Sequence, residues 1–212
     1  QIDRPERGFS FSKPGPLDMR MGYDSTTQTA ADFLATCDHS ELVAILREYG
    51  EIDFAPRLAE RILTERQKDP LVTTSDLFSC VEKAIPGRLR PKTNQTAAQV
   101  FQALRIHIND ELGELKTVIG DGFDSLAVKG RLCLIAFHSL EDRLVTHSFQ
   151  RLSGKSAREN LPRELPLASA QVDSVINMKA KIIKPFPIKP AAEETKANPR
   201  SRSARLRTLE KI

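Results

Sequence analysis

The sequence predicts an α/β protein in which part of a doubly wound sheet is joined to an all-helical module. The run 130–137, Gly-Arg-Leu-Cys-Leu-Ile-Ala-Phe, is apolar at nearly every position, which is typical of a strand buried on both faces of a parallel sheet. Helical patterns lie on both sides of this run, and residues 25–86 show helical patterns throughout. Because one strand cannot form a sheet, we expect the missing strands to come from polypeptide outside these residues.

N-terminal signals predict the helices within residues 25–86. Thr29-Ala-Ala-Asp32 and Thr73-Thr-Ser-Asp76 have the capping-box pattern, and Asp38-His-Ser-Glu41 is a third start signal. In residues 53–67 apolar side chains recur every four positions, which predicts a further helix with one buried face. These helices are expected to form a compact module.

The remaining elements are predicted from the spacing of apolar residues and from the positions of prolines and glycines. Prolines and glycines make residues 1–24 loop-like, and residues 86–94 form a basic linker. Apolar residues spaced by three and four predict one long helix over 101–119. After the apolar strand we expect a helix over 141–152, a loop over 153–170, a weaker strand over 175–183 and a last short strand over 204–212.

Length and composition exclude several classes of protein. The chain has 212 residues, of which 40% are apolar and 28% charged, and no eighteen-residue run is apolar throughout, so neither a disordered polymer nor a membrane span is expected. Cys37, Cys80 and Cys133 are odd in number and far apart, which argues against a disulfide framework and a CxxC metal site. This cysteine usage favours a reducing compartment, and we expect a cytoplasmic protein. Residues 1–12 have neither the basic start nor the apolar stretch of a secretory signal, and we expect the chain to be a fragment of a longer protein.

The excess of positive charge lies at the C-terminus. The chain has a net charge of +4, residues 196–212 carry +5, and the other residues sum to −1. Arginine can bind phosphate through two parallel hydrogen bonds, so this end is a candidate contact for a nucleic-acid backbone. A solvated basic tail would have the same composition, and charge alone leaves both interpretations open.

Polar side chains follow the apolar strand directly. The segment His138-Ser-Leu-Glu-Asp-Arg143 holds an imidazole, a hydroxyl, two carboxylates and a guanidinium. Ligands of doubly wound sheets bind outside the carboxyl ends of the strands, so this segment is the candidate site. Ser139-Leu-Glu-Asp142 also has the capping-box pattern, so Ser139 could cap the next helix, and His138 could brace the loop instead of acting in a pocket.

Short motifs from one end of the chain to the other carry a resemblance to a known family. They are Pro5-Glu-Arg-Gly-Phe-Ser-Phe11 with Gly15-Pro-Leu-Asp-Met-Arg-Met21, Leu46-Arg-Glu-Tyr-Gly50, Phe101-Gln-Ala-Leu-Arg-Ile106 with Asn109-Asp-Glu-Leu112, Phe137-His-Ser-Leu-Glu-Asp-Arg143, and Asn198-Pro-Arg-Ser-Arg-Ser203. In these motifs, their order and their spacing, the chain resembles the RsmH or MraW family, the small-subunit ribosomal RNA (cytosine-N(4)-)-methyltransferases.

The resemblance implies an enzyme that uses S-adenosyl-L-methionine to methylate the exocyclic amine N(4) of a cytidine in the decoding region of small-subunit ribosomal RNA. It also implies a partial Rossmann-like class I methyltransferase core with an inserted all-helical domain. The chain would then consist of a loop segment of the core (1–24), an inserted helical substrate-recognition domain (25–94), and the C-terminal part of the core with a basic tail (95–212). The implied partner is small-subunit ribosomal RNA or the small ribosomal subunit, with no metal and no membrane.

The chain departs from the family pattern at its beginning. Family members start with about a hundred further residues, which hold the glycine-rich cofactor loop and a segment Asp-Leu-Gly-Val-Ser-Ser-Pro-Gln. Only the last residue of that segment is present, as Gln1, which the resemblance makes a cofactor contact. We therefore predict that this polypeptide alone is inactive and binds S-adenosylmethionine poorly or not at all. Micromolar binding in calorimetry would contradict this prediction.

The sequence leaves the catalytic group unknown and offers candidates for two roles. The catalytic candidates are His138, Ser139 and Asp142, and the substrate-binding candidates are Asp18, Arg20, Asn109, Arg200 and Arg202. Asp18 and Arg20 could equally form a structural ion pair, and Asn109 could lie on an exposed helix face. The alternative function is a stand-alone RNA-binding or interaction module without catalysis.

Overall fold

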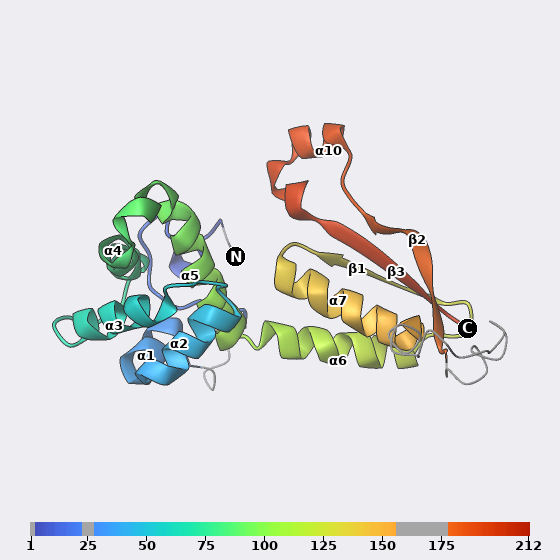
Figure 1. Ribbon diagram of the computed structural model, residues 1–212, viewed down its shortest axis with the longest axis horizontal. Helices are drawn as coiled ribbons and strands as arrows, with labels where there is room; N and C mark the ends of the chain where they lie inside the picture. The colour runs from blue at the N-terminus through green and yellow to red at the C-terminus, as the bar shows by residue number, and fades with distance from the viewer. Residues whose placement is uncertain (1–2, 23–27, 156–177) are drawn as a thin grey trace, which may run out of the picture. The chain divides into compact units, whose positions relative to one another are not determined.

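The computed structural model describes residues 3–22, 28–155 and 178–212 (Figure 1). The chain divides into two compact units, Gln1–Glu111 and Leu112–Ile212. In its described part the first is built of helices and connecting segments, and we call it the helical unit. The second contains three strands and their covering helices, and we call it the sheet unit. The prediction of a mixed α/β protein is therefore confirmed.

The predicted helices of residues 25–86 are confirmed. They are α1 (Ala30–Thr36), α2 (His39–Glu48), α3 (Ala55–Arg66) and α4 (Thr74–Ala84), followed by a 3-10 helix over Gly87–Lys92. Both predicted capping boxes form, because Thr29 accepts the backbone N–H of Asp32 and Thr73 that of Asp76. Each box satisfies backbone donors that the helix leaves unpaired, so these helix starts are fixed locally.

The segment before α1 packs into the core of the helical unit. The side chains of Leu17 and Met19 are almost completely buried. The backbone N–H of Leu17 donates to the carbonyl oxygen of Val72 at 2.9 Å, and Ala31 donates to that of Leu17 at the same distance. These bonds hold an irregular segment between two parts of the unit that are far apart in sequence.

The single long helix predicted over 101–119 is wrong. The structure has two helices, α5 (Thr93–Ile108) and α6 (Glu111–Asp124). Between them Asp110 has a φ angle of +46°, a left-handed conformation that Asp and Asn adopt more readily than other non-glycine residues. Apolar spacing continues on both sides of the break, so periodicity could not locate it.

The sheet unit contains β1 (Arg131–Ala136), β2 (Ala180–Ile188) and β3 (Arg205–Lys211) in the order β1-β3-β2. β3 is antiparallel to both neighbours, so β1 and β2 run in the same direction. The predicted last strand is confirmed as β3. β2 begins within the predicted 175–183 and extends beyond it, whereas 175–177 lie outside the described residues, as does most of the predicted loop over 153–170.

Two helices cover one face of the sheet. α7 (Ser139–Leu152) confirms the predicted helix after β1, and with α6 it packs against the strands. The shared core of this unit consists of Ile119, Phe123, Val145, Phe149, Ala180 and Leu209.

The prediction that residues 130–137 are buried on both faces of a parallel sheet is wrong for the described chain. β1 pairs antiparallel with β3, and its side chains alternate between covered and exposed positions. Ile135 is 59% exposed, since no described element covers that face. Alternation is what the pleat of a strand produces when one face is covered.

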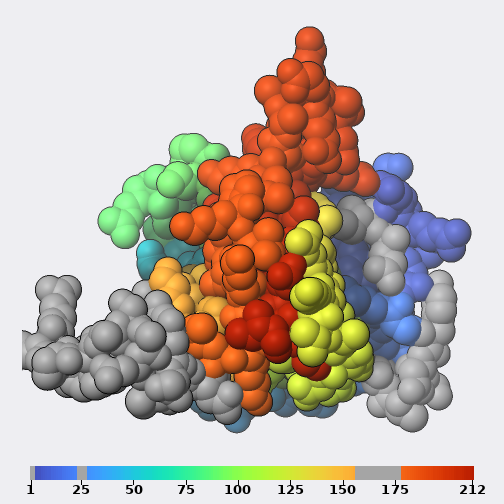
Figure 2. All heavy atoms as spheres, turned by 90° about the vertical axis from the view of Figure 1, so that its right-hand side faces the viewer, coloured from blue at the N-terminus to red at the C-terminus, as the bar shows by residue number. Residues whose placement is uncertain are grey.

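The connection between β2 and β3 lies beyond the sheet. It contains α10 (Ala192–Ala197) and a 3-10 helix over Pro199–Ser203. Figures 1 and 2 show this connection in orange-red, projecting from the sheet unit. The register pairs Ala136 with Arg205 and Ile188 with Leu206. The connection therefore starts and ends at the carboxyl ends of β1 and β2.

Candidate functional site

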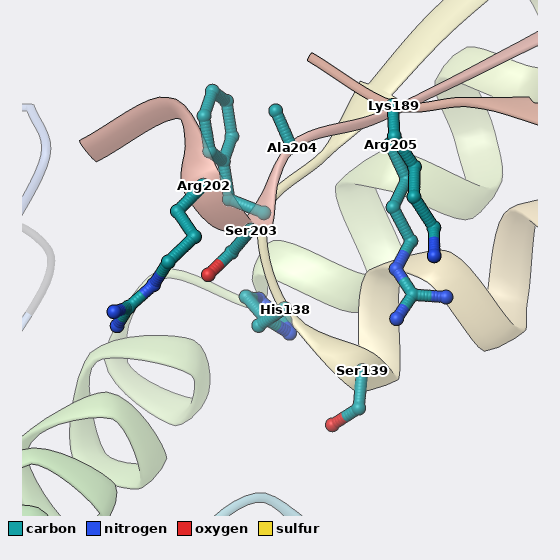
Figure 3. A pocket seen from close by; sticks show the side chains of 8 residues that line it. His138, Ser139, Lys189, Arg202, Ser203, Ala204 and Arg205 are labelled. Atoms are coloured by element: carbon teal, nitrogen blue, oxygen red, sulfur yellow. The ribbon is translucent and has the colours of Figure 1, made fainter. Parts of the chain in front are cut away.

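A pocket of about 430 Å³ lies in the sheet unit where β1 and β2 end and β3 begins (Figure 3). The segments that form its wall follow β1, follow β2 and lead into β3. The lining residues are Phe137, His138, Ser139, Lys189, Arg202, Ser203, Ala204 and Arg205. The pocket includes the start of the segment 138–143 that the sequence marked, at the carboxyl ends of two strands of the same direction, which is a common ligand-binding position.

His138 is the N-cap of α7. Its Nδ1 accepts a hydrogen bond from the backbone N–H of Glu141 at 3.3 Å. Because Nδ1 is an acceptor, a neutral ring carries its proton on Nε2. The prediction that Ser139 caps this helix is wrong, since Ser139 is the first helical residue. Serine is a far commoner cap than histidine, so the local pattern favoured the wrong residue by one position.

Glu141 completes the cap. One carboxylate oxygen, Oε2, accepts the backbone N–H of Phe137 at 2.8 Å and that of His138 at 3.3 Å, while Oε1 lies 3.3 Å from Nε2 of His138. Burial raises the pKa of Glu141, but the hydrogen bonds from His138 and Phe137 outweigh it and place that pKa below its ordinary value. The sequence did not single out Glu141, because the capping-box pattern is defined for serine or threonine as the first residue.

Asp142 is held by arginines of β3. Its Oδ1 accepts Nε of Arg207 at 2.7 Å, and its Oδ2 accepts Nη2 of the same guanidinium at 2.9 Å. Arg207 is a buried side chain and its guanidinium also lies 4.2 Å from the centre of the Phe186 ring. Arg205 reaches Oδ2 at the longer distance of 3.4 Å. The hydrogen bond from Arg207 lowers the pKa of Asp142, so an anionic Asp142 ties α7 to β3.

The site therefore has the chemistry of an anion-binding pocket. The carboxylates of Glu141 and Asp142 are both engaged by hydrogen bonds, and their lowered pKa values make them poor proton acceptors near neutral pH. Lys189, Arg202 and Arg205 line the pocket, and no acidic residue does so among the described residues. The sequence did not single out Lys189, because its position beside Arg205 depends on the pairing of β2 with β3.

The other candidates from the sequence lie in the helical unit or outside the pocket. Asp18 and Arg20 form an ion pair with 2.7 Å between Oδ1 and Nε, and this hydrogen bond lowers the pKa of Asp18. The carboxamide of Asn109 bonds the backbone of the segment before α1. Arg200 lies in the 3-10 helix before β3, apart from the residues that line the pocket. Gln1 lies outside the described residues.

The bonds of Asn109 explain its place at the end of α5. Its Nδ2 donates to the carbonyl oxygens of Met19 and Arg105, each at 2.8 Å, and its Oδ1 accepts the backbone N–H of Met21 at 2.6 Å. All polar atoms of the side chain are therefore used within the helical unit. This is a different position from the exposed helix face that the sequence left open.

Comparison with known proteins establishes the family. The profile of the MraW methylase family matches residues 1–212, so the chain belongs to that family of methylases. A curated relative, the ribosomal RNA small subunit methyltransferase H of Clostridioides difficile (strain 630), is 41% identical over 212 residues. The alignment covers 100% of this chain and 66% of the relative's length. The resemblance found in the sequence motifs is confirmed. No helix in the described parts of the chain is long and apolar enough to cross a membrane.

Proposed function

We propose that the intact protein transfers a methyl group from S-adenosyl-L-methionine to N(4) of a cytidine in the decoding region of small-subunit ribosomal RNA, in the cytoplasm. The observation that carries this proposal is the family match over the whole chain, together with the 41% identity to a protein named for methylation of small-subunit ribosomal RNA. A match of this extent favours an enzyme over a stand-alone RNA-binding or interaction module.

The fold supports a Rossmann-like core that continues outside the described residues. β1 lies at the edge of the sheet, one of its faces is uncovered, and its exposed Ile135 is apolar. Further strands and a covering layer would bury this face and pair this edge. Within such a core we propose that 1–24 and 95–212 belong to the methyltransferase fold and that 25–94 is the inserted domain. The boundary between the two compact units lies after Glu111, later than the proposed boundary at 94, because α5 contributes to the core of the helical unit.

The residues that line the pocket do not fit the methyl donor. S-adenosylmethionine carries a sulfonium, an ammonium and one carboxylate, so its net charge is positive and the three cationic side chains of Lys189, Arg202 and Arg205 would repel the molecule as a whole. The pocket suits the anionic RNA instead. We propose that the donor is held by other residues, including Gln1.

The remaining candidates from the sequence are proposed as substrate contacts. We propose that Arg200 and Arg202 bind RNA phosphate and that Asp18 and Arg20 bind substrate from the helical unit. Asn109 would act on the substrate by positioning the segment that carries Arg20, since its carboxamide bonds Met19 and Met21. His138 and Ser139 are the candidates for contact with the reacting nucleotide, because both line the pocket.

The proposal is tested by methyl transfer to small ribosomal subunits that lack the modification. We expect transfer to cytidine N(4) by the intact gene product and none by this 212-residue chain alone, because the chain spans 66% of its relative. Fully methylated subunits serve as the control substrate and should accept no further methyl group. Absence of transfer by the intact protein, or modification of another atom, would contradict the proposal.

A further inference from the structure

The pocket at the carboxyl ends of β1 and β2 contains positive charge that the described structure does not neutralise. Lys189 and Arg202 are exposed, and neither side chain makes an ion pair or hydrogen bond with any residue that the structure describes. Lys189 lies directly after the pair Ile188–Leu206, so the antiparallel register places it opposite Arg205. Figure 3 shows Lys189 and Arg205 on one side of His138 and Arg202 on the other.

The acidic groups nearest to these cations are already engaged. Arg207 occupies both oxygens of Asp142 at 2.7 and 2.9 Å, which leaves Arg205 a contact of 3.4 Å to that carboxylate. Glu141 accepts backbone N–H groups at the start of α7. The charges of Lys189 and Arg202 are therefore available to a ligand, and Arg205 shares with Arg207 a carboxylate that Arg207 contacts more closely.

Two further features favour a phosphate group as that ligand. α7 is 14 residues long and starts at the pocket with Ser139, so the positive end of its dipole adds to the field of the cations. Ser139 and Ser203 bring hydroxyl groups to the lining, and arginine forms paired hydrogen bonds with phosphate oxygens. A pocket of about 430 Å³ accommodates a phosphodiester with part of its flanking nucleotide.

We infer that this pocket binds one phosphodiester group of the RNA substrate, held jointly by Lys189, Arg202 and Arg205. The inference rests on the proposed function for the identity of the polyanion. It assigns Lys189 a role in binding, and it makes the three cations one subsite that contacts a single phosphate.

The test pairs RNA modification with protein variants in the intact protein. The probe is a decoding-region RNA oligonucleotide in which each phosphate in turn is replaced by an uncharged methylphosphonate. We expect one position at which the replacement weakens binding to the wild type by about tenfold, the loss typical of one charge-assisted contact. That same replacement should weaken binding less in Lys189→Ala and in Arg202→Ala than in the wild type, and least in the double variant, where Arg205 is the only one of the three cations that remains.

The control variant is Lys181→Ala, an exposed lysine near the other end of β2. It should keep the tenfold penalty at the same phosphate. The slope of log affinity against log salt should fall by no more than about 0.7 in the double variant Lys189→Ala/Arg202→Ala, because only one phosphate is involved. Circular dichroism checks that each variant is folded. We expect no loss of structure, because the side chains of Lys189 and Arg202 are exposed.

A penalty that stays the same in wild type and pocket variants at every phosphate would overturn the inference. A fall in slope of about 1.4 in the double variant, the value for two phosphates, would show that Lys189 and Arg202 contact different phosphates and would overturn the shared contact. Methyl transfer is measured in parallel on small subunits. The wild type could transfer no methyl group and still show a methylphosphonate penalty that the pocket variants reduce. In that case the proposed function fails and the phosphate subsite stands.

Discussion

Replacing Asp142 with alanine should lower the free energy of unfolding by about 3 kcal/mol, because it leaves the buried guanidinium of Arg207 without its carboxylate. Urea denaturation of the intact protein, followed by circular dichroism, measures this loss. Asp121→Ala removes an exposed acid from α6 of the same unit and should change the free energy by less than about 0.5 kcal/mol.

A double-mutant cycle separates the ion pair from other effects of the substitution. Arg207→Ala should also be destabilising, and the double variant should cost at least about 1 kcal/mol less than the sum of the two single losses. Additive losses would show that Asp142 and Arg207 stabilise the sheet unit independently, contrary to the geometry.

The same pair predicts a dependence of stability on pH. The hydrogen bond from Arg207 lowers the pKa of Asp142 from its ordinary value of 3.8 in the folded chain. A carboxyl with a lowered pKa stabilises the fold fully at pH values above the unfolded pKa, and this contribution is lost as the pH falls through the folded pKa. The gap in stability between wild type and Asp142→Ala should therefore be constant above about pH 5 and narrow in more acidic solution.

Asn109→Ala should destabilise the helical unit by about 2 kcal/mol, since it removes three hydrogen bonds and leaves the carbonyl oxygen of Met19 without this partner. The matched control is Asn94→Ala, an exposed asparagine near the start of the same helix. Hydrogen exchange of the amide of Met21, which donates to Asn109 Oδ1, provides a local readout and should become faster in the Asn109 variant.

An Asn109 variant with normal stability and normal exchange at Met21 would contradict the positioning role. In that case any loss of methyl transfer would have to arise from direct contact between Asn109 and the substrate. The two measurements therefore distinguish a residue that holds the segment 19–21 from one that binds RNA itself.

Helix starts were predictable from sequence wherever their determinants are local. The capping boxes of α1 and α4 use residues three positions apart, and both form as predicted. The cap of α7 shows the limit of that argument. Serine is the more frequent N-cap residue, so the pattern favoured Ser139, but His138 caps the helix. The family also follows from sequence alone, since its motifs run through the whole chain.

The tertiary structure alone decided which partners the polar side chains contact. Asn109 bonds Met19 and Met21, about ninety positions away, and these bonds accompany a helix break that apolar periodicity does not register. Asp142 on α7, a catalytic candidate from the sequence, forms an ion pair with Arg207 on β3, which lies far from it in the sequence. Lys189 joins the pocket only because β2 pairs with β3. Local propensity and periodicity are properties of neighbouring residues, whereas these contacts depend on how distant segments pack, which no short pattern in the sequence encodes.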